Sequence, residues 1–116
     1  MLPSGNDAAF LIAEVGGYIL QKKGEYINPS NLNKALERRQ GFYVNPYLKE
    51  MNRLAKKIGL QNSNFASVHG MNNSQNLSCA EDLAILCAYS MKNNAFRKVV
   101  QTQKYQYFYT IFEHPT

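Results

Sequence analysis

Apolar residues recur at helical spacing near the start of the chain, directly after a polar corner formed by Ser4, Gly5 and Asn6. The pattern predicts a helix over about residues 6–22, and Ser4 or Asn6 can serve as its N-cap. Many residues of this helix are small (Ala8, Ala9, Ala13, Gly16 and Gly17). Because a glycine inside a helix costs about 1 kcal/mol relative to alanine, the glycine pair indicates a central, buried helix against which another element packs closely.

Two further helices are expected before the middle of the chain. The first is short and covers about residues 30–40. In the second, Asn45 is expected as the N-cap and Pro46 as the first helical residue. Apolar residues then recur every three or four positions (Leu48, Met51, Ala55 and Ile58). Gly59 followed by Leu60 is typical of a glycine-terminated helix with a trailing apolar contact.

The polar residues 61–76 are rich in turn-forming types and predict an ordered loop with one short strand at most. Ser78 and Glu81 match a capping box at the start of a helix over about 78–91. That helix is apolar on nearly all sides, so it is expected to be central. A further short helix is expected over about 94–100.

The segment KYQYFYTIF, residues 104–112, is rich in β-forming residues and predicts a C-terminal strand. A lone strand needs sheet partners, and the chain offers few other strand candidates. The sequence therefore indicates a mainly α, incomplete domain over residues 1–116 with one C-terminal β-strand. An unpaired edge of this strand would favour self-association through residues 104–112.

The formal net charge is +5, and most of the lysines and arginines lie in residues 22–57. A solvated helical face is the favoured interpretation of this segment, and a basic helical binding module for nucleic acid or an anionic polymer is the alternative. No RNA-binding or zinc-finger pattern accompanies the basic residues, so no nucleic-acid partner is expected. No run of about 18 apolar residues predicts a membrane span, and no signal peptide is expected from the first residues.

The cysteines and histidines are not spaced for metal binding or for pairing with each other. Cys79 and Cys87 fall about 12 Å apart in one expected helix. A disulfide allows about 7 Å between Cα atoms, so both are expected to be free residues of the core. His69 and His114 lack metal-ligand spacing, and neither a metal site nor a cofactor is expected.

Several stretches occur in a recognisable order: PSGNDAA, EMNRLAKKIGLQNSNF, VHGM, LSCAEDLAIL and FRKVVQTQKYQYF. This order resembles the D-alanyl-D-alanine carboxypeptidases, the low-molecular-mass penicillin-binding proteins of the serine β-lactamase-like superfamily. Those proteins typically show S-G/A-N-D-A, M-N-x-x-A-x-x-L-G-L-x-N-T-x-F, H-G-L and S-x-A-x-D-L-A. The resemblance covers most of the chain outside residues 22–46. It implies the helical lobe of the β-lactamase/transpeptidase-like fold and a central fragment of a serine-type carboxypeptidase.

In that family, catalysis uses the motifs S-x-x-K, S-x-N and K-T-G, and Ser4-Gly5-Asn6 matches the second. The resemblance implies that Ser4 relays a proton between the catalytic lysine and the departing amine. Asn6 would present its side-chain amide to the backbone of a D-Ala-D-Ala peptide or a β-lactam. His69 is expected to hydrogen-bond local backbone rather than act as a general base, and Asp82 to be a structural hydrogen-bonding or solvent-facing group.

The other two catalytic motifs are absent from the chain. No serine has a lysine three residues later, and no lysine precedes Thr-Gly or Ser-Gly. Without an activated nucleophile beside its base, the chain alone is expected to have no carboxypeptidase activity. A non-catalytic interaction domain on the same scaffold is a further alternative. Localisation outside the cytoplasm, where the family acts on peptidoglycan-type peptides, is suggested by the resemblance only.

Overall fold

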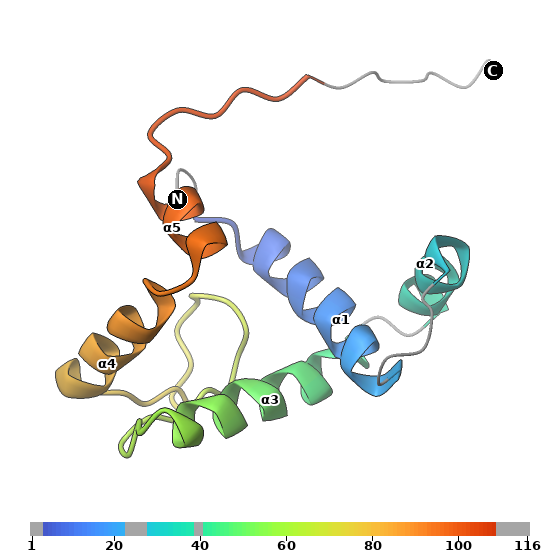
Figure 1. Cartoon of the computed structure of the whole chain (residues 1–116). Coiled ribbons are helices and arrows are strands. Elements are labelled where there is room, and N and C mark those ends of the chain that lie inside the picture. The colour runs from blue at the N-terminus through green and yellow to red at the C-terminus, as the bar shows by residue number, and fades with distance from the viewer. Residues whose placement is uncertain (1–3, 23–27, 39–40, 109–116) are drawn as a thin grey trace.

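The computed structural model describes residues 4–22, 28–38 and 41–108, and these ranges are almost entirely helices and loops. Their elements, in chain order, are α1 (Asn6–Lys22), α2 (Pro29–Arg38), α3 (Val44–Lys57), α4 (Ala80–Ser90) and α5 (Asn94–Gln101). The one β feature in the described ranges is an isolated antiparallel bridge between Asn64 and Leu77. In Figure 1 the long loop between α3 and α4 extends toward the start of α1. The prediction of a mainly α chain is confirmed.

A close contact within the described ranges joins α1 to the turn that precedes α3. A Cβ atom built on Gly17 would lie 1.7 Å from the backbone oxygen of Tyr43, and one on Gly16 would lie 2.6 Å from the Tyr47 ring. The Tyr18 and Tyr43 rings meet edge to face, with centroids 5.1 Å apart. The close approach that the glycine pair predicted is therefore present, and the partner of α1 in this contact is the start of α3 with the turn before it.

The buried core is small. Apart from the polar Glu14 and Asp82, the buried residues of the described ranges are Ala13, Gly17, Tyr18, Tyr43, Ala55 and Leu60. The backbone N–H of Gly41 donates to the buried carboxylate of Glu14, which ties the turn before α3 to the middle of α1.

The prediction of two central helices is only partly correct. Helix α1 buries one face against α3, but Leu11 and Ile12 on its other side are about half exposed (54% and 61%). Helix α4 buries only Asp82. The two cysteines are not in the core, because Cys79 is half-buried and Cys87 is exposed. The physical reason is that no second layer of described chain lies over these apolar surfaces.

The C-terminal end of α3 was predicted correctly, and its N-terminal end was not. Gly59 has φ +96°, and the amides of Gly59 and Leu60 donate to the carbonyls of Lys56 and Ala55 at 3.2 and 2.9 Å. These are the two bonds of a Schellman motif, and the trailing Leu60 is buried. At its start, α3 uses Tyr43 rather than Asn45 as the N-cap residue.

The capping box predicted for α4 does not form. The residue at the N-cap is Cys79, and its side chain makes no capping hydrogen bond. The hydroxyl of Ser78 lies 2.8 Å from the hydroxyl of Ser63 instead. In α5 the cap is made by Asn93, whose side chain accepts from the Phe96 amide at 3.0 Å.

The described part of the predicted C-terminal strand, residues 104–108, forms no strand, and residues 109–112 lie outside the described ranges. A β-strand needs a neighbour to pair with, and within the described ranges none lies beside this segment. Tyr105 and Phe108 are 74% and 82% exposed. None of the helices in the described ranges combines the length and apolar character that crossing a membrane requires.

Candidate active site

The polar corner at the start of α1 is open to solvent on one side. Ser4 is exposed, Asn6 is half-buried, and the helix begins as the Gly5 carbonyl accepts from the Ala9 amide at 3.0 Å. Among the described residues, no first-turn amide of α1 donates to the side chain of Ser4 or of Asn6. The capping role that the sequence left open for these two side chains is therefore not what the structure shows.

Asn6 is held instead by a loop far along the chain. Its side-chain oxygen, Oδ1, accepts from the backbone N–H of Gly70 at 3.2 Å. The bond brings the S-G-N corner together with the His69-Gly70 pair, which the sequence singled out separately. It also fixes the direction of the Asn6 amide. The Nδ2 group, with two N–H donors, has no partner among the described residues and remains available to a ligand.

The loop that carries Gly70 is anchored to α3 by Asn52. The Asn52 side chain donates from Nδ2 to the Phe65 carbonyl, and its Oδ1 accepts from the Phe65 amide, both at 2.8 Å. This two-way contact resembles a rung of a β-ladder made by a side chain. Asn52 was not among the residues predicted from the sequence, although an asparagine at a partly buried helix position requires polar partners and is a signal for such an anchor.

Asp82 anchors the first residues of the same loop to α4. It is 3% exposed and accepts from the amide of Asn62 at 2.8 Å and from the hydroxyl of Ser63 at 2.7 Å. The Ser63 hydroxyl is the main cause that lowers the pKa of the Asp82 carboxyl, opposed by burial and assisted by the Asn62 amide. Of the two roles expected for Asp82, the structural hydrogen-bonding one is confirmed.

His69 stabilises its own turn. Its Nδ1 atom accepts from the backbone amide of Met71 at 3.2 Å, and its carbonyl lies 3.4 Å from the Ser67 hydroxyl. The prediction that His69 hydrogen-bonds local backbone is confirmed. The Nδ1 lone pair is engaged and is not directed at a serine.

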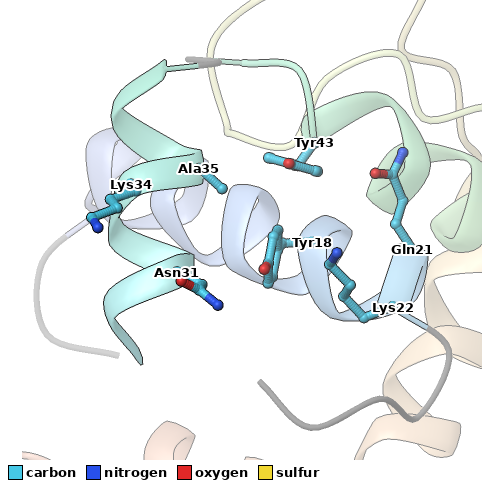
Figure 2. Close-up of a pocket in the computed structure, with 7 residues that line it drawn as sticks. All are labelled: Tyr18, Gln21, Lys22, Asn31, Lys34, Ala35 and Tyr43. Carbon is cyan, nitrogen blue, oxygen red and sulfur yellow. The ribbon is translucent and has the colours of Figure 1, made fainter. Parts of the chain in front are cut away.

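Two surface cavities lie at different distances from the polar corner. A hollow of about 330 Å³ lies along the loop, and Ser67, His69 and Asn76 are among the residues that line it. Figure 2 shows a larger one, of about 570 Å³, between α1 and α2, with Tyr18 and Lys34 at its wall. Tyr18 lies about 18 Å along α1 from Asn6 at 1.5 Å per residue. The larger hollow is therefore separate from the polar corner.

The corner lacks a reactive centre of its own. The chain's serines all lie in the described ranges, and none of them is hydrogen-bonded to a lysine there. Within the same ranges, no group of three or more His, Cys, Asp or Glu side chains is placed to hold a metal ion. The Ser4 hydroxyl and the Asn6 amide are the polar groups of the corner, and no serine–lysine pair accompanies them in the part of the chain that the structure describes.

Comparison with known proteins relates the chain to one family. The sequence model described as D-alanyl-D-alanine carboxypeptidase matches residues 41–114. The chain is 33% identical over 105 residues to a D-alanyl-D-alanine carboxypeptidase of a Streptomyces species, strain K15, covering 90% of this chain and 30% of that protein. It is 31% identical over 70 residues to D-alanyl-D-alanine carboxypeptidase DacA of Haemophilus influenzae, covering 50% of this chain and 18% of that protein.

Two solved structures of the Streptomyces K15 DD-transpeptidase share the fold. A cysteine-to-alanine mutant superposes with a TM-score of 0.62 at 32% identity, covering 89% of this chain and 33% of the other. A serine-to-alanine mutant gives the same TM-score at 31% identity, with the same coverage. The predicted helical part of the transpeptidase-like fold is confirmed, and the chain spans no more than about a third of the relatives that it matches.

Proposed function

The chain belongs to the D-alanyl-D-alanine carboxypeptidase family, and on that premise we propose that it supplies the S-x-N element of a serine-type D,D-peptidase site. Ser4 and Asn6 are the residues that would face the substrate, a D-Ala-D-Ala peptide or a β-lactam. As a fragment of such an enzyme, the chain corresponds to about 30% of the matched Streptomyces protein.

The observation that carries the proposal is the hydrogen bond from the Gly70 amide to Asn6 Oδ1. It occupies the acceptor of the side-chain amide and leaves the Nδ2 donors for a ligand. A peptide carbonyl oxygen is the acceptor that such donors suit. Ser4 is exposed beside them, and its hydroxyl can both accept a proton and donate one, as a relay between a lysine and a departing amine requires.

The catalytic nucleophile and its base would come from outside this sequence. The chain has neither S-x-x-K nor K-T-G, and an isolated hydroxyl is a weak nucleophile without an adjacent base. We therefore expect the chain alone to orient a ligand and not to react with it.

A chimera with the Streptomyces transpeptidase tests the proposal. This chain would replace the segment that it matches there, and acylation by a fluorescent penicillin would be measured. We expect Asn6→Ala to slow acylation by about 100-fold, the order of loss when a bound substrate is misplaced by about 1 Å. The control is Asn45→Ala, because Asn45 is exposed on α3 and makes no hydrogen bond with its side chain in the described ranges. Equal rates for the chimera and its Asn6→Ala and Ser4→Ala variants would refute the assignment.

The alternative of a basic binding module gains no support. Residues 41–114, which include α3 with its exposed Lys56 and Lys57, match the carboxypeptidase family. Arg53 on the same helix is paired with Glu50 at 2.5 Å. These contacts fit a solvated helical face, the interpretation that the sequence favoured.

Self-association through residues 104–112 is retained as a separate proposal. It now rests on the exposure of Tyr105 and Phe108 rather than on a strand edge. Size-exclusion chromatography over a concentration series tests it. An elution volume that shifts with concentration in the native chain but not after Tyr105→Ser and Phe108→Ser is expected, and a constant monomeric volume would contradict the proposal.

A further inference from the structure

We infer that the loop of residues 61–78 is a positioning device for Asn6, and that Asn76 is the positioning residue that braces the part of the loop that carries Gly70. The inference rests on the proposed function, because it explains how the S-x-N asparagine is held for a substrate. It assigns a role to a residue outside the S-x-N motif.

The base of the loop is closed by a short backbone ladder. The amides of Asn64 and Leu77 donate to each other's carbonyls at 2.7 and 2.9 Å. The Asn64 side chain adds a bond to the Gln75 carbonyl at 2.9 Å. These bonds hold the two stems side by side and leave the tip to be shaped by other contacts.

Asn76 makes the next connection across the loop. Its Oδ1 accepts from the amides of Ala66 and Ser67 at 2.6 and 3.1 Å, and its Nδ2 donates to the Ser67 hydroxyl at 2.7 Å. One half-buried side chain therefore engages three groups on the opposite stem. A replacement for Asn76 therefore needs a side-chain acceptor at the same distance from the backbone.

The brace is connected to Asn6 through the turn at the tip. The Ser67 hydroxyl that Asn76 holds also lies 3.4 Å from the His69 carbonyl, and His69 Nδ1 receives the Met71 amide at 3.2 Å. Between these contacts the Gly70 amide points out of the turn and donates to Asn6 Oδ1. The position of the Gly70 donor, and with it the orientation of the Asn6 amide, thus depends on the brace.

The outer anchors do not pass through Asn76. Asn52 holds Phe65 to α3, and Asp82 holds Asn62 and Ser63 to α4. Removing the Asn76 side chain therefore leaves the first stem attached to both helices and the second stem paired with it through Asn64 and Leu77, and releases mainly the tip. This separation allows the positioning role to be distinguished from a general contribution to stability.

The test is NMR of the full chain, read as the ratio of two NOE intensities. The first connects the Gly70 amide proton with the Asn6 side chain, and the second, as an internal reference, connects Gly17 with Tyr43 at the α1–α3 contact. We expect Asn76→Ala to lower the ratio at least about twofold, because losing one hydrogen bond of ordinary net strength lowers the equilibrium constant for the ordered tip about fivefold. Asn76→Asp keeps the acceptor for both amides and is expected to restore most of the ratio.

The control is Asn72→Ala, in the same loop. Asn72 is exposed, has no side-chain hydrogen bond in the described ranges, and is expected to leave the ratio unchanged. If Asn76→Ala does not fold, as shown by loss of the Gly17–Tyr43 reference, Ser67→Ala replaces it, with an expected reduction of at least about twofold.

An unchanged ratio in Asn76→Ala, or in Ser67→Ala where that variant is used, would overturn the inference. Equal reduction by Asn72→Ala would do so too. The NMR measurement needs no catalytic activity. If Asn76→Ala lowered the NOE ratio as expected but the chimera were not acylated, only the proposed function would be refuted.

Discussion

Replacing Gly17 with alanine is expected to destabilise the protein, although alanine is the better helix former. The reason is the backbone of Tyr43, which packs directly on the Gly17 Cα. An alanine Cβ would lie 1.7 Å from the Tyr43 oxygen and 2.7 Å from the Tyr43 carbonyl carbon. Since non-bonded heavy atoms are in favourable contact at about 3.5 Å, α1 and the turn before α3 would have to separate by about 1.8 Å.

The size of this destabilisation follows from two unfavourable contributions and one favourable one. Overpacking of this kind costs about 1–3 kcal/mol. The separation also disturbs the Tyr18–Tyr43 edge-to-face pair, which is worth about 1 kcal/mol beyond its buried area. Alanine returns about 1 kcal/mol through helix propensity. The free energy of unfolding should therefore fall by about 1–3 kcal/mol.

Urea denaturation followed by circular dichroism at 222 nm measures this change. Gly16→Ala is the matched control, because its Cβ would meet only the Tyr47 ring, at 2.6 Å. A ring can rotate away and a backbone carbonyl cannot, so we expect Gly16→Ala to cost less than about 1 kcal/mol. If Gly17→Ala were as stable as the native chain, or more stable, the close approach of α1 to Tyr43 would be refuted.

Three further outcomes are expected. The free energy of unfolding should fall as the pH drops below about 4. The lowered pKa of Asp82 means that its ionised carboxylate stabilises the folded state above the ordinary carboxyl pKa, and this stabilisation is lost when Asp82 is protonated. Urea midpoints from pH 2.5 to 7 should show a weaker pH dependence for Asp82→Asn than for Glu81→Gln, and equal profiles would contradict this role. Asn52→Ala should cost about 2 kcal/mol by leaving the backbone groups of Phe65 without partners, as measured by urea denaturation, whereas a loss no larger than that of Asn45→Ala would contradict the anchor. Finally, fluorescent penicillin should not label the isolated chain covalently, and a label recovered on one of its serines by mass spectrometry would overturn the predicted inactivity.

Features with local causes could be predicted from the sequence. Helix α1 covers the predicted residues, because a polar corner followed by an apolar pattern specifies a helix start. The end at Gly59 follows from glycine's tolerance of positive φ. The Gly16–Gly17 pair also indicated a close contact, since two glycines in a helix interior need a packing reason.

Features that depend on distant partners could not be predicted. The apolar surface of α4 suggested burial, but burial requires a covering element, and the described chain supplies none for Leu83. Ser78 has the right spacing for a cap, yet the Ser63 hydroxyl competes for it across the loop. Asn76 looks like any turn residue, because its three partners are set by the folded loop.

The candidate site joins the start of α1 to Gly70, a donor 64 residues away in sequence. The same separation has a kinetic consequence. Closing a flexible loop of that length costs about 4 kcal/mol of chain entropy, more than one exposed hydrogen bond returns. The bond must therefore form late, after α1 has docked and the loop has ordered. During synthesis, Asn6 leaves the ribosome 64 residues ahead of Gly70 and acquires its final orientation only after that donor has followed it.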